Sequence, residues 1–145
     1  MAVRYDTQET GFRFRGRREM TARIRRCVAS EGFRAGDIAV VFCSDAFLLA
    51  MNREYLGHDY YTDVITFDYS DLPARMVSGD LFISVDTVAD NALQFGVARD
   101  EELRRVILHG VLHLCGYGDK TDAEQRVMRS KEDFYLRQPL LNNQP

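Results

Sequence analysis

The chain has 145 residues, of which 46% are hydrophobic and 28% charged, as is typical of a globular protein. Nine Phe and seven Tyr supply enough apolar surface for a core, which excludes disorder as the main state. No apolar run approaches the ~18 residues of a membrane span, and residues 1–18 contain no apolar signal core. We therefore expect a cytoplasmic protein that does not contact a membrane. The three cysteines form no Cys-x-x-Cys pair, which fits small buried residues in a reducing compartment.

The net charge of −3 is distributed unevenly along the chain. Residues 1–34 contain nine arginines and four acidic residues, whereas residues 35–145 have a clear excess of acid. Such an asymmetry is one sign of a surface that binds a polyanion. A solvated helix and strand face is the alternative interpretation.

The predicted elements begin with two short strands at residues 4–5 and 12–15, where polar and apolar residues alternate on either side of Gly11. These two strands indicate a hairpin. Apolar residues then recur at helical spacing over residues 17–29. The continuous apolar run at residues 37–43 is typical of a strand buried on both faces of a sheet.

The remaining pattern alternates between helices and strands. A helix capped by Ser44 or Asp45 extends to about Leu56. Further strands are predicted at 64–69 and 81–85, and further helices at 86–94, 100–115 and 122–136. Together with the hairpin, this order predicts an α+β fold with a mixed sheet of about four strands and packed helices. We expect one domain over residues 1–137 and a loose tail over residues 138–145.

His109 and His113 are the most informative residues of the long helix predicted at 100–115. Residues four apart lie on one face of a helix, so two imidazoles at this spacing can share one metal ion. The helix carries no charged residue between Val106 and Cys115, so both histidines lie in an apolar stretch. The alternative is two buried histidines that each bond to a nearby carbonyl group.

Asp119 follows the two histidines after a glycine-rich stop. Gly116 and Gly118 should end the helix and turn the chain back, which brings the Asp119 carboxylate to the same ion. The resulting His-x-x-x-His-x-x-Gly-x-x-Asp spacing matches the ligand pattern of metzincins, with Asp in the third position. Two imidazoles and one carboxylate with an open position are typical of a catalytic metal site. The alternative is that Asp119 caps the last helix near Thr121.

Gly110 argues against a protease at this zincin-like helix. Zinc metalloproteases carry a general-base glutamate directly after the first histidine, and glycine accepts no proton. Glycine also costs about 1 kcal/mol relative to alanine inside a helix. Another part of the chain should therefore approach this position closely.

The segment His109-Gly110-Val111-Leu112-His113-Leu114-Cys115-Gly116-Tyr117 resembles the signature of the YbeY family, bacterial metal-dependent endoribonucleases of ribosomal RNA maturation. Three upstream segments resemble the same family, in the same order and spacing. They are Met51-Asn52-Arg53-Glu54-Tyr55, Thr62-Asp63-Val64-Ile65-Thr66-Phe67 and Gly79-Asp80-Leu81-Phe82-Ile83-Ser84. The resemblance extends from about Val40 to Leu136 and so covers most of the chain.

The resemblance implies a hydrolase, a single-strand endoribonuclease that matures small-subunit ribosomal RNA during ribosome biogenesis. Its partners would be ribosomal RNA and the small ribosomal subunit, and not DNA. His109, His113 and Asp119 would hold one Zn²⁺ and leave a position for water, whose pKa the ion lowers to about 7. A carboxylate ligand would make the site less selective against Mn²⁺ or Fe²⁺.

Two positions depart from the common pattern of the family. Most members have a third histidine where this chain has Asp119, although a branch typical of Bacteroidetes carries Asp-Lys-Thr there. Most members also have an arginine where this chain has Leu56, which cannot handle phosphate. His58 and Lys120 are the candidate catalytic residues that would replace this arginine. A simple surface histidine is the alternative for His58.

An RNA substrate would give the arginine-rich segment a function, because arginine makes bidentate contacts with phosphate. The candidate RNA-binding residues are Arg13, Arg15, Arg23 and Arg26. Two other functions compete with the nuclease. Gly110 disfavours a metzincin-like protease, whereas Leu56 favours a non-catalytic ribosome assembly factor with a structural metal.

Overall fold

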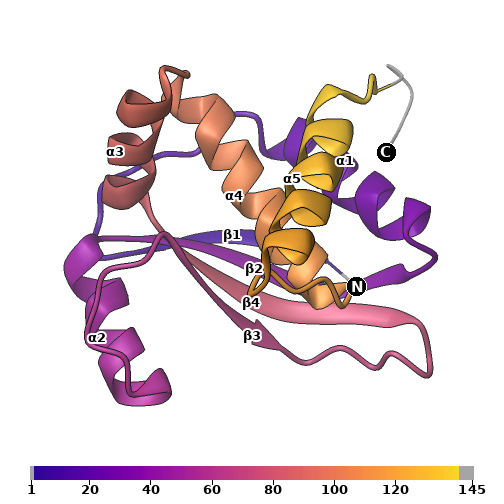
Figure 1. The fold of residues 1–145 in the computed structure, drawn as a ribbon, viewed down its shortest axis with the longest axis horizontal. Helices are drawn as coiled ribbons and strands as arrows, with labels where there is room; N and C mark the ends of the chain where they lie inside the picture. The colour runs from indigo at the N-terminus through magenta and orange to yellow at the C-terminus, as the bar shows by residue number, and fades with distance from the viewer. Residues whose placement is uncertain (1, 141–145) are drawn as a thin grey trace.

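A computed structural model describes residues 2–140 and shows a four-stranded sheet packed against helices (Figure 1). The strands are β1 (Val3–Gln8), β2 (Arg34–Cys43), β3 (Val64–Asp68) and β4 (Met76–Ser84). The helices are α1 (Arg17–Ser30), α2 (Asp45–Leu56), α3 (Val85–Phe95), α4 (Arg99–Leu114) and α5 (Asp122–Arg137). Most of the expected tail at 138–145 lies outside the described residues. None of the described helices is long and apolar enough to cross a membrane.

The sheet has the strand order β1-β2-β4-β3. β1 pairs with β2 and β2 pairs with β4 in parallel, whereas β3 runs antiparallel to β4. The predicted mixed sheet and α+β class are therefore confirmed. β2 lies between two strands, and residues 38–43 are all buried, as the continuous apolar run predicts.

The predicted N-terminal hairpin is wrong. β1 pairs with β2, which follows the α1 crossover, and residues 10–16 form neither strand nor helix. The alternation that resembles a strand has another cause, because Phe12 and Phe14 both pack on Phe42 of β2. Their ring centroids lie 5.2 and 5.1 Å from that of Phe42. The period of two thus reflects two aromatic anchors in a loop, not a ladder of backbone hydrogen bonds.

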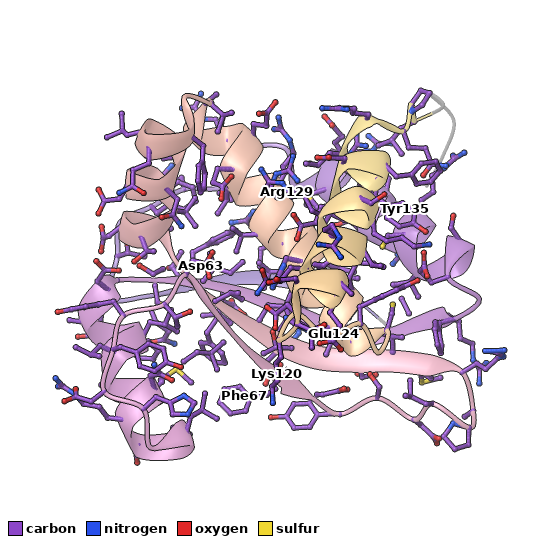
Figure 2. The ribbon with its side chains drawn as sticks, in the orientation of Figure 1. Asp63, Phe67, Lys120, Glu124, Arg129 and Tyr135 are labelled. Atoms are coloured by element: carbon purple, nitrogen blue, oxygen red, sulfur yellow. The ribbon has the colours of Figure 1, made fainter. Side chains whose placement is uncertain are left out.

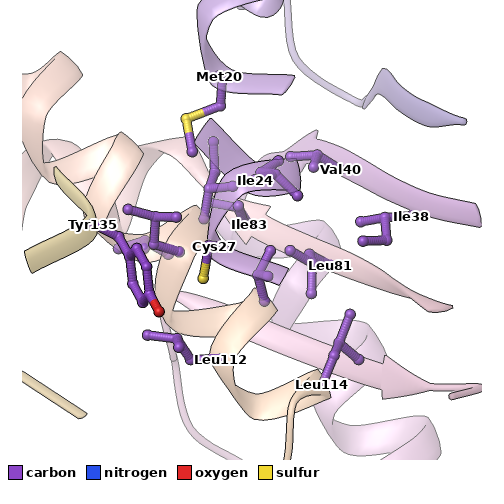
Figure 3. Packing of buried hydrophobic residues seen from close by; sticks show 14 of the residues in the cluster. Met20, Ile24, Cys27, Ile38, Val40, Leu81, Ile83, Leu112, Leu114 and Tyr135 are labelled. Carbon is purple, nitrogen blue, oxygen red and sulfur yellow. The ribbon is translucent and has the colours of Figure 1, made fainter. Parts of the chain in front are cut away.

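The main core lies between one face of the sheet and helices α1 and α4. Leu81 and Ile83 of β4 point toward Leu112 and Leu114 of α4 and toward α1 (Figure 3). All four side chains are fully buried. The apolar middle of α4 is thus fixed against the sheet, which sets the position of both histidines.

Two glycines allow α4 to approach β4 closely. A Cβ atom at Gly110 would lie 2.8 Å from Leu81 Cδ2, and one at Gly79 would lie 2.7 Å from Leu114 Cδ2. Both distances are shorter than normal carbon contacts. The expected close approach at Gly110 is therefore confirmed, and it is the β4 strand that makes it.

Helix α2 lies on the opposite side of the sheet from α4 and α5 (Figure 1). Its Leu48 packs with Cys43 and Ile65 in a second, smaller buried cluster. Ser44 caps this helix by accepting a hydrogen bond from the Phe47 N–H, and Gly57 ends it at a φ of 67°. The chain then leads into β3, so that the end of α2 and the start of β3 lie opposite the C-terminal part of α4.

Candidate metal centre

His109 and His113 present their Nε2 atoms to each other from one face of α4. The two Nε2 atoms lie 3.0 Å apart, with the imidazole rings nearly perpendicular. The Asp119 Oδ2 atom lies 3.2 Å from His109 Nε2 and 3.4 Å from His113 Nε2. The structure thus brings together the three side chains that the sequence spacing predicts to be metal ligands.

The turn after α4 returns Asp119 to the histidines. The Tyr117 N–H donates to the Leu112 carbonyl, and Gly116 takes a φ of 105° that only glycine adopts readily. Thr121, not Asp119, caps α5 by accepting from the Glu124 N–H in a capping box. The capping alternative for Asp119 is therefore wrong, and its carboxylate faces the imidazoles instead.

The second nitrogen of each imidazole has its own acceptor. The Nδ1 atom of His109 lies 2.7 Å from Glu132 Oε2, and that of His113 lies 2.8 Å from the Tyr117 carbonyl oxygen. A carboxylate and a carbonyl only accept, so each Nδ1–H donates. In a neutral imidazole this leaves a lone pair on Nε2.

Three electron-rich atoms therefore face one another across 3.0–3.4 Å. Such an arrangement is repulsive unless a cation or extra protons lie between the atoms. Ligands bound tetrahedrally to Zn²⁺ at 2.0–2.1 Å lie about 3.3 Å from one another. The three described atoms match that separation, so His109, His113 and Asp119 fit a divalent transition-metal ion. The alternative of two simple buried histidines does not explain why both lone pairs converge.

Glu132 orients His109 from α5, and sequence reasoning missed it. Its side chain is only 5% exposed, and its other oxygen accepts from Arg105 Nη1 at 3.1 Å. Arg105 also donates to Asp133 at 2.6 Å. Carboxylate–histidine–metal chains of this kind fix the ring and make the ligand more basic. No local signal in the sequence predicts the pair, because Glu132 lies 23 positions beyond His109 on another helix.

Charge around His109 favours its protonated form. Burial disfavours the imidazolium, but the hydrogen bond and charge of Glu132, with smaller contributions from Asp63 and Asp119, outweigh burial and raise the pKa of His109. The same negative field attracts a metal cation. The pKa of Asp63 is raised by burial, partly offset by the attraction of His109. Asp63 directly precedes β3 and lies beside the start of α3 in Figure 2, where its carbonyl oxygen accepts from the Ser84 N–H.

A cavity of about 580 Å³ opens onto the three ligands. One wall carries His109, His113 and Asp119, and the other is formed by the end of α2, the following loop and β3. Three residues singled out in the sequence also line it, namely Leu56, His58 and Lys120. Lys120 extends from the turn before α5 toward β3 (Figure 2). The structure thus places both candidate catalytic residues in the cavity of the metal centre.

His58 is exposed on the wall opposite the ligands. Its Nδ1 atom lies 3.0 Å from the Tyr60 hydroxyl, and the two rings are stacked. Its backbone N–H donates to the Asn52 carbonyl at 3.1 Å. Sequence reasoning did not single out Tyr60, and it included Asn52 only as part of a family-like segment, without a role of its own.

The candidate RNA-binding arginines fall into two groups. Arg13 and Arg15 are exposed in the loop before α1, and Arg26 is partly exposed on α1. Arg23 differs, because its Nη1 atom donates to the carbonyl oxygens of Tyr135, Leu136 and Gln138 at 2.6–3.0 Å. The Arg23 guanidinium therefore links the C-terminal end of α5 to α1 through these hydrogen bonds.

Comparisons with known proteins agree with this site. The sequence profile described as Endoribonuclease YbeY matches residues 6–139. A protein of that name from Bacteroides thetaiotaomicron is 52% identical over 136 residues, which are 94% of this chain and 98% of the relative. One from Phocaeicola vulgatus is 52% identical over 83% of this chain and 86% of its own.

The solution structure of TM1509 from Thermotoga maritima shares the fold, with a TM-score of 0.64 at 24% identity. The alignment covers 93% of this chain and 87% of that chain. The match to the family profile over most of the chain, and a relative at 52% identity along 98% of its length, lead to one conclusion. The chain belongs to the YbeY family.

Proposed function

We propose that the protein is a metal-dependent endoribonuclease that cleaves single-stranded regions of ribosomal RNA during maturation of the small ribosomal subunit. The observation that carries the proposal is the convergence of three acceptor atoms at an open cavity. The name that its relatives share, Endoribonuclease YbeY, supports the substrate class. Residues 1–137 would form the one catalytic domain, and the protein would act in the cytoplasm.

His109, His113 and Asp119 would hold one ion, and Zn²⁺ suits two imidazoles and a carboxylate best. Mn²⁺ and Fe²⁺ remain compatible with this ligand set, because the carboxylate is a hard ligand. When bound, the ion supplies Lewis-acid chemistry, which activates water or polarises a phosphoryl oxygen. Glu132 and the Tyr117 carbonyl hold the two imidazoles in the orientation that this requires.

The remaining roles belong to residues that line the same cavity. Lys120 would place its ammonium group against a phosphate of the RNA. His58 would move a proton through Nε2, because its Nδ1 atom pairs with the Tyr60 hydroxyl. Gly110 is turned toward Leu81 in the core and offers no base, which separates this site from that of a zinc protease.

The arginine-rich N-terminal region would bind RNA away from the cavity. Arg13, Arg15 and Arg26 are the residues we propose for phosphate contacts, since the Arg23 guanidinium is already engaged with α5. Such contacts recognise the backbone and not the base sequence. The partner we propose is the small ribosomal subunit with its RNA, and not DNA.

A second candidate function is a ribosome assembly factor whose metal is structural. Leu56 favours it, because this residue places an aliphatic side chain at the cavity where most members of the family carry arginine. The two functions share the fold, the metal and the RNA partner. They differ in whether RNA is cut.

Cleavage of precursor small-subunit ribosomal RNA, with and without a chelator, distinguishes the two functions. The metal-loaded protein should cut the RNA, the chelator should stop cleavage, and added Zn²⁺ should restore it. His113→Ala, purified in parallel, serves as a control against a contaminating nuclease and should be inactive. Cleavage that persists equally in this variant would contradict the proposal, and intact RNA under all conditions would favour the assembly factor.

A further inference from the structure

Tyr60 is an exposed aromatic residue in the wall of the metal cavity. It is 56% exposed, although large aromatic side chains usually bury most of their surface. It lines the cavity that also contains His109, His113 and Asp119. The adjacent Tyr61 is exposed to a similar extent, at 61%, but is not among the residues that line this cavity.

The position of Tyr60 is fixed although its ring is exposed. The buried Asn52 side chain donates to the Tyr60 carbonyl oxygen at 2.8 Å, which ties the loop to α2. Arg53 and Asp59 form a second link at 2.5 Å between the same two segments. The His58 ring stacks on Tyr60 with centroids 5.2 Å apart and planes at 18°. An aromatic surface held in this way loses little conformational entropy when a ligand binds.

The opposite wall of the cavity would attract phosphate once the three ligands hold a metal ion. Lys120 lies on that wall too, so that its ammonium group, the metal ligands and the aromatic surface share one space of about 580 Å³. This volume lies in the range of sites that bind small organic ligands. A nucleotide combines both chemistries, since its phosphate is anionic and its base presents a flat π surface.

We propose that the Tyr60 ring, backed by His58, stacks against one base of the RNA strand whose phosphate lies at the metal centre. This inference rests on the proposed function and adds a base-binding subsite to it. Stacking of this kind accepts any base, because every base has a π face. It also selects unpaired RNA, because a base in a duplex is already stacked on its neighbours.

Binding of a strand of about eight nucleotides tests the subsite separately from cleavage. The probe is a fluorescein-labelled 2′-O-methyl oligoadenylate, with a gel run afterwards to show that it remains intact. Tyr60→Ala, loaded with metal, should bind it at least about fivefold more weakly than the wild type. Tyr60→Phe, which keeps the ring, should bind nearly as well as the wild type, and so should the matched control Tyr61→Ala.

An abasic strand with the same sugar–phosphate backbone provides the decisive comparison. The wild type and Tyr60→Ala should bind the abasic strand equally, since only the base contacts the ring. Equal affinity of both proteins for the oligoadenylate would overturn the inference. So would an equal loss on both strands, or a loss of bound metal from Tyr60→Ala by elemental analysis, because either would assign Tyr60 to the structure of the loop.

Failure of the subsite and failure of the proposed function give different results. If the wild type cleaves unmodified RNA but Tyr60→Ala binds oligoadenylate normally, the nuclease function is supported and the stacking inference is wrong. If the wild type cleaves no RNA but Tyr60→Ala binds oligoadenylate weakly and the abasic strand normally, the stacking inference is supported and the protein is an assembly factor rather than a nuclease.

Discussion

The two walls of the metal cavity differ in how their side chains are held. On the α4 wall, both imidazoles have an acceptor on Nδ1, and the acceptor of His109 is itself bonded to Arg105. On the α2–β3 wall, His58 and Tyr60 are exposed and contact mainly each other and the end of α2. The comparison shows one wall whose imidazoles are held by hydrogen bonds to neighbouring groups and one wall that exposes an aromatic surface, which suits the proposed metal site and the proposed base-binding subsite respectively.

The largest expected effect follows from removing the charge of a ligand on the α4 wall. Asp119→Asn keeps the shape of the side chain but is a much poorer ligand, so the bound metal should fall far below one ion per chain. Elemental analysis after dialysis measures this. Because Thr121 and not Asp119 caps α5, the free energy of unfolding of the metal-free protein should change by less than about 1 kcal/mol. Metal content equal to that of the wild type would remove Asp119 from the ligand set.

A smaller effect is expected when the support of His109 is weakened. Glu132→Gln removes the carboxylate that accepts from Nδ1, and loss of such an outer group typically lowers metal affinity about 10- to 100-fold. Competition with a fluorescent zinc chelator measures the affinity. Glu101→Gln in the exposed first turn of α4 is a control that should leave affinity within about twofold, because Glu101 precedes His109 by about two helical turns. Equal affinities of Glu132→Gln and the wild type would show that the rigidity of the α4 wall comes from packing alone.

The smallest effect on the metal, but a clear effect on stability, is expected at Glu31. This nearly buried carboxylate at the end of α1 accepts from the hydroxyls of Tyr117 and Tyr135 and from Lys131. Burial raises its pKa, but these three partners outweigh burial and lower it below the usual 4.5. The contribution of Glu31 to stability is therefore complete above the usual pKa and is lost as pH falls through the lowered value.

Glu31→Gln should accordingly lower the free energy of unfolding by about 1–3 kcal/mol near neutral pH. The difference from the wild type should shrink as pH falls below about 4.5, where the wild-type carboxyl becomes protonated. Urea unfolding across a pH series measures it, with Glu54→Gln on the exposed face of α2 as the control. A difference that stays constant down to acid pH would mean that the charge of Glu31 is not what holds Tyr117 and α5.

Most elements of the fold could be predicted because they carry strong local patterns. The histidines, the glycine stop and Asp119 all lie within 11 consecutive residues, so one helix and one turn suffice to place them. The N-terminal hairpin was wrong because the spacing of Phe12 and Phe14 imitates a strand, whereas only the tertiary contact with Phe42 explains it.

The parts of the site that could not be predicted depend on contacts between distant segments. Glu132 reaches His109 from another helix, and Glu31 reaches Tyr117 across 86 positions. Tyr60 lines the cavity and its neighbour Tyr61 does not, and the hydrogen bond from Asn52 to the Tyr60 carbonyl oxygen is a contact between two segments. Periodicity and spacing describe one helix or strand at a time and do not predict how two of them pack together.

The position of Glu132 in α5, downstream of both histidines and Asp119, has a consequence for the order in which the candidate metal site forms. A growing chain emerges from its N-terminus at about 5–20 residues per second, so both histidines and Asp119 become available before α5 does. Until α5 docks, His109 lacks the acceptor that sets its tautomer and its direction. His109 therefore takes the orientation seen in the structure only after α5 has been synthesised and has docked on α4.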